Sequence, residues 1–440
     1  MADHLSDFLS RVSSRQTRVG VVGLGYVGLP TVRAFHDAGF PVIGFDIDSA
    51  KVEALRRGEA YLKHLGEDWV RELACSRRFH ATGRAEDLKD ADAIILCVPT
   101  PLGAHREPDL TFVEKSTATV APHLKRGALI VLTSTSYPGT TREVCLPLLE
   151  RGDRRCGRDF FLAFSPERED PGRADLLSHQ IPRLVGGIDE ASLKAVLTLF
   201  SSAIRTVIPV ASMEVAESAK LLENIYRAVN IALVNELKPV LASMGIDIWQ
   251  VIAAASTKPF GFQAFHPGPG LGGHCIPIDP FYLTWKAREY GHQTRFIELA
   301  GEVNAGMPHY VVEQVARALN DDGKPVKGSD VLVIGLAYKP NVDDVRETPA
   351  AEILSLLIDR GARVSYHDPH VARFPRMRNY DLELETQALT PDRVRRADCV
   401  LIVTNHRAIE WNLIASEAHL IVDTRNALEG LPVRGRLVKA

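Results

Sequence analysis

A glycine pattern near the start of the sequence constrains the fold of this chain more than any other feature. Gly23, Gly25 and Gly28 have the spacing GxGxxG. They follow an apolar run at 18–23 that is typical of a strand buried on both faces, and residues 29–38 after them have helical character. Gly23 permits a tight turn, Gly25 lets a ligand approach the backbone at the helix N-terminus, and Gly28 permits close packing of helix on strand. The pattern predicts a nucleotide-binding strand–turn–helix unit, and the alternative is a glycine-rich turn without a ligand.

An acidic residue at the end of the next strand indicates which dinucleotide is bound. Asp46 follows an apolar run at 41–45 and lies 18 residues beyond Gly28. A carboxylate there accepts hydrogen bonds from ribose hydroxyls and repels a 2′-phosphate, so we expect NAD as the cofactor. Lys51 is a further candidate contact, with a solvated helix charge as the alternative. The other cofactor contacts expected from the turn and from later strand ends are Tyr26, Val27, Pro99, Thr100 and Thr135.

Strand-like apolar runs recur along the chain and alternate with helical stretches, which indicates an α/β protein with parallel sheets. They cover 93–98, 128–132 and 160–164, and later 331–335, 363–366, 399–403 and 420–422. Between these groups, residues 213–243 contain no glycine and suggest one long helix, 257–282 form a glycine- and proline-rich loop, and 320–330 form a linker. A later helix is expected to begin with Thr348 as its N-cap and to close at Gly361.

We therefore expect two Rossmann-like doubly wound domains joined by a long central helix and a helical middle domain. The expected boundaries are 1–210 for the NAD-binding domain, 211–319 for the helical middle and 320–440 for the C-terminal α/β domain.

Composition excludes several classes of protein. The formal net charge is -3, so no basic field favours nucleic acid or an anionic membrane as a partner. The six cysteines form no CxxC pair and no cluster with zinc-ligand spacing, which predicts no metal site and a reducing compartment. The N-terminus is too acidic and polar for a signal peptide, and no apolar run reaches the ~20 residues of a membrane span, so we expect a cytoplasmic protein.

The most unusual stretch surrounds one of these cysteines. Cys275 follows Gly272, Gly273 and His274, and the two glycines leave its sulfur open to approach. Asp279 places a carboxylate four residues on, within a rigid Pro-x-Asp-Pro segment. Because the thiolate is the reactive form of cysteine, this setting predicts a nucleophile rather than a buried structural cysteine.

The cysteine stretch and the glycine fingerprint together resemble the UDP-glucose/GDP-mannose dehydrogenases. The motif Gly-Gly-His-Cys-Ile-Pro-Ile-Asp-Pro at 272–280 carries the resemblance, and further motifs extend it over nearly the whole chain. They are Ser-Thr-x-x-Pro-Gly at 134–139, Ser-Pro-Glu at 165–167, Ala-Lys-x-x-x-Asn at 219–224 and the segment 335–347. Members of this family oxidise C6 of a nucleotide sugar from alcohol to carboxylic acid, using two NAD in succession.

The resemblance implies covalent catalysis. Cys275 would attack the aldehyde formed by the first oxidation, and oxidation of the thiohemiacetal would give a thioester. Lys220 and Asn224 are four residues apart, so they share a helix face and would stabilise the oxyanion. Asp279 would order a water or hold Lys220. The alternative for Lys220 and Asn224 is a solvated helix face.

Hydrolysis of the thioester needs a base and a water. The resemblance implies that Glu167 is this base and that Thr135 holds the water. The alternative for Glu167 is a helix-capping carboxylate. The group that takes the first proton stays open between Lys220, Glu167 and an ordered water.

The resemblance also implies contacts to a UDP-sugar. Lys339 and Arg346 match phosphate and cofactor contacts from the C-terminal domain, and Arg425 is a weaker candidate that a surface arginine explains equally well. The loop at 260–271 would wrap the uridine diphosphate. The remaining expected substrate contacts are Glu167, Arg168, Lys220, Asn224, His266, Gly270, Gly272 and Gly273. Family members dimerise through the long helix, so we expect a homodimer.

His274 is the best indicator of the sugar. Hexose enzymes of the family typically have Gly-Gly-Ser-Cys, whereas His274 and the residues after the cysteine are similar to enzymes for N-acetylated sugars. The segments 165–172 and 268–286 look most like UDP-N-acetylglucosamine 6-dehydrogenases, which implies a role in polysaccharide or O-antigen precursor synthesis. UDP-N-acetylmannosamine, UDP-N-acetylgalactosamine and UDP-glucose are the alternative substrates. A two-electron dehydrogenase and a non-catalytic nucleotide-sugar sensor are rival classes, and neither needs Cys275.

Overall fold

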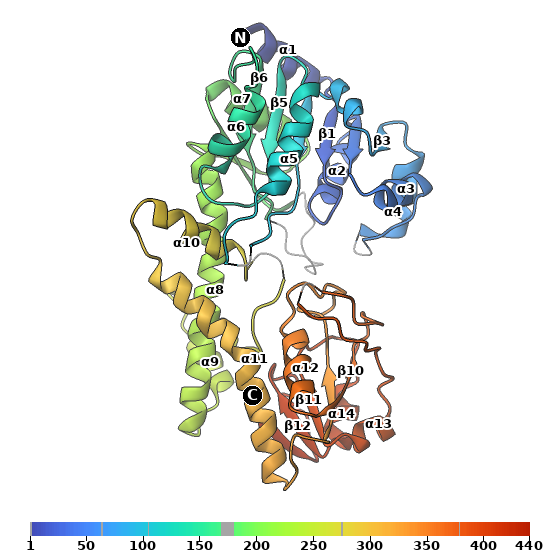
Figure 1. Ribbon diagram of the computed structural model, residues 1–440, viewed down its shortest axis with the longest axis vertical. Coiled ribbons are helices and arrows are strands. Elements are labelled where there is room, and N and C mark those ends of the chain that lie inside the picture. Colours follow the sequence, from blue (N-terminus) through green and yellow to red (C-terminus); the bar gives the residue numbers. More distant parts are fainter. Residues whose placement is uncertain (1, 63–64, 104, 169–179, 274–275, 378) are drawn as a thin grey trace. The chain divides into compact units, whose positions relative to one another are not determined.

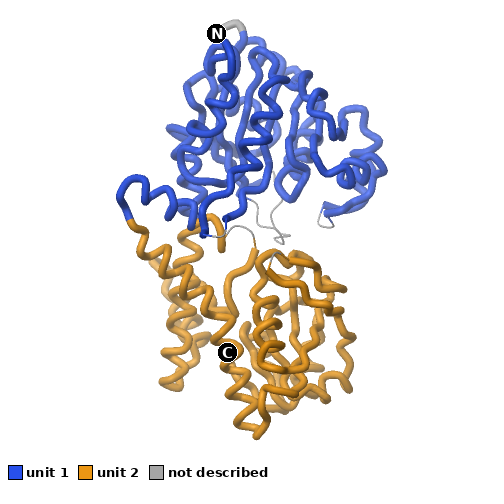
Figure 2. The backbone as a smooth tube through the Cα atoms, in the orientation of Figure 1, with its two compact units in different colours: residues 1–223, 281–292 blue, residues 224–280, 293–440 orange. Residues whose placement is uncertain are grey.

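The computed structural model describes residues 2–62, 65–103, 105–168, 180–273, 276–377 and 379–440. The chain forms two compact units, and each is assembled from two separate segments (Figure 2). Unit 1 comprises Met1–Glu223 and Phe281–His292, and unit 2 comprises Asn224–Pro280 and Gln293–Ala440. Each unit contains one sheet covered by helices, which confirms the expected α/β class (Figure 1).

The sheet of unit 1 has eight strands in the order β3-β2-β1-β4-β5-β6-β7-β8. The strands are β1 (Val19–Val22), β2 (Val42–Phe45), β3 (Phe79–Thr82), β4 (Ala93–Leu96), β5 (Ala128–Leu132), β6 (Phe160–Phe164), β7 (Arg183–Gly187) and β8 (Val207–Pro209). The chain runs outward from β1 through β2 to β3 and then returns to β4 on the other side of β1, so the strand order reverses between β1 and β4. In open sheets of this kind, ligands bind at the carboxyl ends of the strands beside that reversal.

One pairing departs from the expected parallel sheet. β6 and β7 are antiparallel, with Ala163 opposite Gly187 and Phe164 opposite Gly186, whereas every other strand pair described in this sheet is parallel. The expected parallel strands are confirmed from β1 to β6, and β7 is an antiparallel strand that was not predicted. Alternation of strands and helices does not fix the direction of a strand, and doubly wound sheets often carry an antiparallel strand.

Both faces of this sheet are buried, which explains why its strands are continuous apolar runs. Alternate side chains of β5 point into two cores, with Leu129 and Val131 in one and Ile130 and Leu132 in the other. The first core receives side chains from α1 (Ala2–Ser13), α2 (Gly28–Asp37), α3 (Ser49–Arg57), α4 (Glu67–Cys75) and α7 (Glu190–Ser201). The second receives them from α5 (Thr111–Val120) and α6 (Leu146–Leu149) and from the short helical segments η2 (Ala85–Asp90), η3 (Ala121–His123) and η4 (Thr141–Cys145).

The long helix expected at 213–243 is confirmed as α8 (Met213–Ser243), and it contributes residues to both units. Three further helices follow it: α9 (Ile248–Ala255), α10 (Asp279–Glu289) and α11 (Arg295–Asp321). The loop expected at 257–282 ends earlier than predicted, because α10 begins at Asp279. Pro280 is compatible with this start, since proline lacks only an N–H that the first helical turn leaves unused.

The sheet of unit 2 has five parallel strands in the order β10-β9-β11-β12-β13. They are β9 (Asp330–Ile334), β10 (Arg363–His367), β11 (Cys399–Ile402), β12 (Leu420–Asp423) and β13 (Arg436–Lys439). One face packs on α11 and α12 (Pro349–Asp359), and the other on α13 (Pro391–Arg396) and α14 (Trp411–Glu417). As expected, Thr348 caps α12 by accepting from Ala350 N, and Gly361 follows the helix with a φ of +82°. No helix in the described part of the chain is long and apolar enough to span a membrane.

Candidate active site

The glycine turn between β1 and α2 has room for a ligand at one of its three glycines. A side chain at Gly23, whose φ is +90°, would collide with the Cys97 carbonyl oxygen, and one at Gly28 would collide with the Gly23 carbonyl oxygen. A Cβ atom at Gly25, in contrast, would meet nothing within 4 Å. Two glycines are thus required by packing, whereas Gly25 borders open space at the N-terminus of α2. This arrangement suits a pyrophosphate group.

The carboxylate of Asp46 is built into this turn. Asp46 is only 6% exposed, and its Oδ2 accepts from Leu24 N at 2.8 Å while its Oδ1 accepts from Asp48 N at 2.9 Å. Lys51 Nζ lies 3.4 Å from Asp46 Oδ2, so its ammonium group is next to the carboxylate. The Tyr61 hydroxyl also contacts this turn, since it donates a hydrogen bond to Leu24 O at 2.6 Å. The residues present therefore fit the adenosine half of NAD, with Asp46 at its ribose.

The loops after β4 and β5 are tied together beside the glycine turn. Thr100 Oγ1 donates to Thr135 O at 2.7 Å, and Ser134 Oγ donates to Val98 O at 2.7 Å. The buried Tyr282 of α10 donates its hydroxyl to Thr100 O. The candidate cofactor residues at these strand ends thus belong to one hydrogen-bonded rim, in which Thr100 is buried.

Several other predicted residues occupy the edges of this rim. Pro99 is exposed, whereas Tyr26, Val27 and Thr135 are partly buried. Their side chains therefore lie at the surface of the carboxyl edge of the sheet, where a bound dinucleotide would meet them.

Glu167 is held by two arginines at the end of β6. Its Oε2 accepts from Arg183 Nη2 at 2.5 Å, and its Oε1 accepts from the backbone N of Arg168 at 2.8 Å. The side chains of Arg183 and Glu167 are only 6% and 11% exposed, so this is a largely buried ion pair. Charges of both residues act on the thiol of Cys97, whose pKa burial raises to about 11. Cys97 contacts the glycine turn, so the pair lies close behind the cofactor loop.

Arg183 is a candidate site residue that the sequence analysis missed. It is the first residue of β7, and its Nη1 is buried without a hydrogen-bond partner among the described residues. An arginine at the start of the apolar run 183–187 was the available signal, because a buried cation is nearly always paired with an acid. The side chain of Arg168, which was predicted, pairs instead with Glu223 on α8, with Nη2 2.6 Å from Oε1.

Three predicted catalytic residues are buried on α8 and at the start of α10. Lys220, Asn224 and Asp279 are 7%, 5% and 2% exposed, respectively. Asn224 Nδ2 donates to Asp279 Oδ2 at 2.6 Å, a contact that the sequence analysis did not anticipate. Lys220 and Asn224 lie one turn apart on α8, as their spacing predicts. Cys275 and His274 lie outside the described residues, as does the segment 169–172.

A buried glutamate fixes the Ser-Thr-x-x-Pro-Gly loop to α8. Glu217 Oε1 accepts from the backbone N of Thr141 at 3.0 Å and from its hydroxyl at 2.7 Å, and Oε2 accepts from Gly139 N at 2.6 Å. Glu217 is 2% exposed, and burial raises its pKa to about 7 against the effect of these donors. This contact positions the loop that carries Thr135.

The glycine- and proline-rich loop of unit 2 packs on loops of the second sheet. Gly273 lies against the ring of Tyr338 and Gly272 against the Cβ of the same residue, and Gly273 N donates to Arg346 O at 2.9 Å. The guanidinium group of the partly buried Arg425 lies against Gly268 and donates from Nε to Val403 O at 2.8 Å.

Two further predicted residues belong to the same loop. The ring of His266 stacks on Trp249, with centroids 5.4 Å apart. Gly270 has a φ of +134° and lies against Pro308 and Pro349. The predicted substrate residues of this loop therefore pack on helices α9, α11 and α12 of unit 2.

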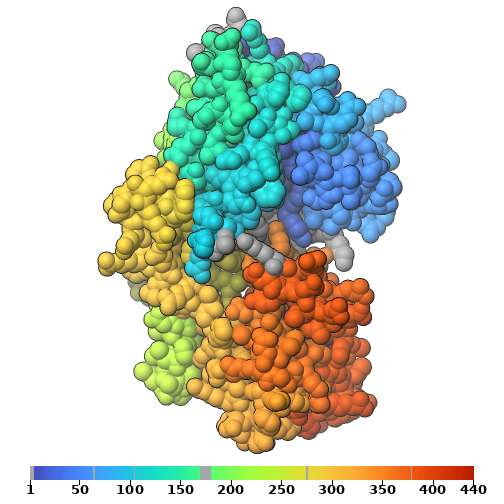
Figure 3. Space-filling model, in the orientation of Figure 1, coloured from blue at the N-terminus to red at the C-terminus, as the bar shows by residue number. Residues whose placement is uncertain are grey.

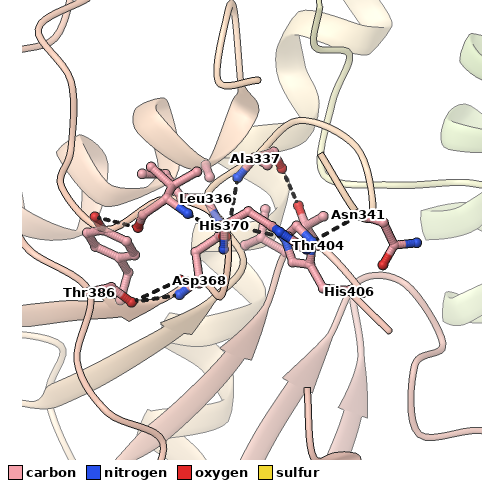
Figure 4. Close-up of polar contacts among 12 residues, drawn as sticks. Leu336, Ala337, Asn341, Asp368, His370, Thr386, Thr404 and His406 are labelled. Carbon is pink, nitrogen blue, oxygen red and sulfur yellow. Dashed lines mark hydrogen bonds and ion pairs between the residues drawn. The ribbon is translucent and has the colours of Figure 1, made fainter. Parts of the chain in front are cut away.

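The loop that carries Lys339 is held by a buried acid–histidine pair (Figure 4). Asp368 Oδ2, at the end of β10, accepts from Leu336 N at 2.7 Å and Ala337 N at 3.0 Å. His406 Nδ1 accepts from Asn341 N, which leaves its Nε2–H to donate to Asp368 Oδ2 at 3.0 Å. Burial opposes ionisation of Asp368, but these donors lower its pKa to about 2.

Arg346 is oriented by an acid of its own loop. Asp344 is 5% exposed and its Oδ2 lies 2.6 Å from Arg346 Nη2, which leaves the side chain of Arg346 39% exposed. Arg346 is thereby fixed at the surface of unit 2, where it is able to meet an anionic ligand.

Comparisons with known proteins identify the family. Models of the UDP-glucose/GDP-mannose dehydrogenase family match the chain in three parts: the NAD binding domain at 17–204, the central domain at 214–306 and the UDP binding domain at 332–430. The chain belongs to the UDP-glucose/GDP-mannose dehydrogenase family. It is accordingly an NAD-dependent UDP-sugar dehydrogenase, and the fit of the glycine turn to NAD agrees with this assignment.

Relatives of this UDP-sugar dehydrogenase include enzymes named for different sugars. The chain is 37% identical over 374 residues to a UDP-N-acetyl-D-glucosamine 6-dehydrogenase from Pseudomonas aeruginosa, covering 84% of this chain and 86% of the relative. It is 36% identical over 391 residues to protein CapL from Staphylococcus aureus, covering 88% and 90%. The solved structure of a UDP-D-ManNAc dehydrogenase from Pyrococcus horikoshii superimposes with a TM-score of 0.85 at 31% identity, covering 96% and 98%.

Within its described residues, the dehydrogenase has no group of three or more histidine, cysteine, aspartate or glutamate side chains that could hold a metal ion. The polar groups collected at the carboxyl edge of the first sheet are instead a carboxylate held by arginine, hydroxyl groups and backbone amides. These groups suit proton transfer and oxyanion binding.

Proposed function

We propose that this enzyme oxidises the C6 hydroxymethyl group of a UDP-N-acetylhexosamine, most specifically UDP-N-acetylglucosamine, to the carboxylic acid. The observation that carries the proposal is the Glu167 carboxylate, which Arg183 and Arg168 hold behind the cofactor loop. A dehydrogenase that stops at an aldehyde or ketone has no need for a base that activates water, whereas a four-electron oxidation through a thioester does.

In this proposal the substrate stays covalently attached between the two oxidations. NAD, when bound, supplies the hydride acceptor for each of them. The Cys275 thiolate adds to the carbonyl carbon of the aldehyde to form a thiohemiacetal, and loss of hydride and proton from that adduct gives a thioester. The ammonium group of Lys220 and the amide of Asn224 stabilise the oxyanion. Asp279 fixes the Asn224 amide, since it accepts a hydrogen bond from Nδ2.

Glu167 then completes the reaction as general base. It takes a proton from a water that Thr135 holds, the hydroxyl oxygen bonds to the thioester carbon, and the carbon–sulfur bond breaks to return the Cys275 thiolate. Arg183 orients the Glu167 carboxylate for this step, since its Nη2 donates to Oε2 at 2.5 Å.

The uridine diphosphate is proposed to bind to unit 2. Backbone groups at Gly268, Gly270, Gly272 and Gly273 approach it, and His266 of the same loop is a further contact. Lys339 and Arg425 supply positive charge for the diphosphate, which is a suitable partner for lysine and arginine side chains. Arg346, oriented by Asp344, is proposed to contact the cofactor.

The choice of an N-acetylated sugar rests on two observations. His274 precedes the cysteine in this chain where hexose enzymes typically have serine. Relatives with 37% and 33% identity are named for UDP-N-acetyl-D-glucosamine and UDP-N-acetyl-D-mannosamine, respectively. A UDP-N-acetylhexosaminuronic acid is a building block for polysaccharide or O-antigen synthesis, and we propose that the enzyme supplies such a precursor.

A substrate panel tests this proposal. UDP-glucose, UDP-GlcNAc, UDP-GalNAc and UDP-ManNAc are each supplied in limiting amount with excess NAD, and NADH is counted per sugar. We expect UDP-GlcNAc to have the highest kcat/KM and to yield two NADH. One NADH per sugar would contradict the four-electron reaction, and preference for UDP-glucose would contradict the N-acetyl assignment.

The covalent step has its own test. In Cys275→Ser, which replaces the thiolate with a poor nucleophile, turnover should stall at the aldehyde or at a slowly hydrolysed ester, and kcat should fall by at least ~100-fold. Cys75→Ser, which changes an exposed thiol at the end of α4, is the matched control. Full activity of Cys275→Ser would refute the covalent mechanism.

A further inference from the structure

A basic cavity lies on unit 1 at the edge of the sheet opposite the cofactor loop. It is formed by the segments 118–126 and 149–160, which precede β5 and β6, and its volume is about 540 Å³. The cofactor loop follows the carboxyl end of β1, whereas this cavity borders the amino ends of β5 and β6, about 16 Å away along the strands. Helices α5 and α6, which flank the region, are on the side of unit 1 that faces the reader (Figures 1 and 3).

The cavity is lined by more cations than anions. Its charged lining residues are five cations, Lys125, Arg126, Arg151, Arg154 and Arg158, and two carboxylates, Asp153 and Asp159. This balance contrasts with the whole chain, whose formal net charge is -3. A concave surface with an excess of positive charge concentrates anions from solution.

Hydrogen bonds fix the shape of the cavity before any ligand arrives. Asp159 Oδ2 accepts from Arg155 N and from Arg158 Nε, both at 2.9 Å, and Glu150 Oε1 accepts from Cys156 N at 2.9 Å. Arg154 donates to the Ala121 carbonyl oxygen, which joins the two segments across the cavity. These contacts order Arg154 and Arg158, so the frame of the cavity is formed before a ligand binds.

Two of the guanidinium groups are left for a ligand. Lys125 is neutralised by Asp92, with Nζ 2.6 Å from Oδ1, and Arg158 by Asp159. Arg126 and Arg151, in contrast, are exposed and form no hydrogen bond or ion pair within the part of the chain that the structure describes, and the charge of Arg126 acts on the nearby Asp159. Two arginine forks of this kind match the geometry of phosphate oxygens.

The floor of the cavity is apolar. It is formed by Ala121, Leu124, Leu149 and Phe160, none of which is more than 8% exposed. A cationic rim over an apolar floor suits a molecule with a flat apolar part and a polyphosphate part, and the volume lies within the range of small-molecule sites.

We propose that this basic cavity is an effector site for a polyphosphate group, whose source is a nucleoside triphosphate or inorganic polyphosphate. Arg126 and Arg151 bind the phosphate oxygens, and a base, where one is present, packs on the floor. The site is separate from the catalytic edge of the sheet, so its ligand binds without competing with the cofactor.

Hydrogen–deuterium exchange of the full chain, in the presence of NAD, locates the binding site. The probes are GTP and inorganic tripolyphosphate. We expect GTP to protect peptides that cover 118–127 and 149–160, with an affinity that falls as salt is added. Tighter binding of GTP than of tripolyphosphate supports a nucleotide source, and equal binding supports an inorganic one. Absence of protection in both segments with both probes would overturn the proposal.

A double variant identifies the phosphate contacts. Arg126→Ala with Arg151→Ala should raise the Kd of the bound probe at least ~10-fold while basal turnover stays unchanged, because neither residue belongs to the catalytic machinery. The control is Arg373→Ala with Arg376→Ala, two exposed arginines of unit 2 with the same change in charge. Equal affinity of the two double variants would assign the protection to another site and refute the proposal.

Discussion

The pair formed by Glu167 and Arg183 illustrates how a single buried cation determines the chemistry of a carboxylate. A solvated glutamate turns freely and exchanges its partners, but Glu167 has one oxygen on Arg183 and the other on a backbone amide. Loss of one partner of a buried ion pair leaves an uncompensated charge, which typically costs ~3–5 kcal/mol. Arg183 is therefore a positioning residue in our proposal.

Replacement of Arg183 should separate the two halves of the reaction. In Arg183→Met, thioester hydrolysis should slow by ~100-fold or more, because the base loses its orientation and its countercharge. The acyl-enzyme on Cys275 should then accumulate and be visible by intact-protein mass spectrometry, while the first NADH forms at a normal rate. Arg183→Lys keeps the charge and should restore part of the hydrolysis. Equal slowing of both oxidations, without an adduct, would assign Arg183 a purely structural role.

Two glycines of the turn between β1 and α2, Gly25 and Gly28, should respond differently to substitution by alanine. Gly25→Ala adds a methyl group to open space, so the free energy of unfolding should change by less than ~0.5 kcal/mol while the Kd for NAD rises at least ~10-fold. Gly28→Ala forces a methyl group into the Gly23 carbonyl oxygen and should destabilise the unit by ~1–3 kcal/mol. Denaturant unfolding and cofactor titration of both variants check this contrast. If Gly25→Ala bound NAD with normal affinity, the pyrophosphate of the cofactor would not lie at Gly25, which would contradict this prediction.

Elements that are buried on both faces were predictable from the sequence, and half-exposed ones were not. β4 and β5 are fully buried apolar runs, and their positions were confirmed within two residues. β3 begins with partly and fully exposed residues, and β8 is largely exposed, so neither has a continuous apolar signal.

The glycine turn and Asp46 were predictable because their geometry is local. The partners of Glu167 and Asp279 were not, because strand β7 and helix α8 bring them from distant parts of the chain.

The attachment of the Ser-Thr-x-x-Pro-Gly loop to α8 should depend on pH. Burial raises the pKa of Glu217 to about 7, above its ordinary value of 4.5, so the folded state binds this proton more tightly than the unfolded state. Its contribution to stability is therefore fully present below pH 4.5 and is lost as the pH rises through about 7, a change of ~3 kcal/mol.

Comparison of the wild type with Glu217→Gln isolates this contribution. The difference between their free energies of unfolding should shift by ~3 kcal/mol in favour of the variant between pH 4.5 and 8, since glutamine does not titrate. Urea unfolding across this range provides the measurement. Glu214→Gln, on a partly buried side chain that pairs with Arg142, is the control. A constant difference across the range would contradict the assignment.

At the scale of the whole molecule, α8 presents an apolar stripe that unit 1 and unit 2 leave exposed. Its side chains are between 39% and 65% exposed and recur at spacings of three, four and seven residues: Leu222, Tyr226, Leu233, Leu237 and Val240. A continuous stripe of this size on one helix is typical of a protein–protein interface. We propose that it pairs with α8 of a second copy.

Charge placed in this stripe should separate the two copies. The wild type should have twice the mass of the 48.4 kDa chain in light scattering, whereas Leu233→Glu with Leu237→Glu should have the mass of one chain. Ile47→Glu, at an 84% exposed position outside α8, is the control for a charge on an exposed apolar residue. A dimer that persists in the double variant would assign the contact to another surface.

The interleaving of the two units in the sequence has a consequence for synthesis on the ribosome. Unit 1 is not complete at Glu223, because it also includes Phe281–His292. Tyr282 of this returning segment is fully buried, and Lys286 pairs with Glu143 at 2.7 Å. During translation, the first unit therefore keeps an uncovered apolar surface until residues 224–292 have been made, most of them belonging to the second unit. The two units thus depend on each other in the order of folding, although each has a core of its own.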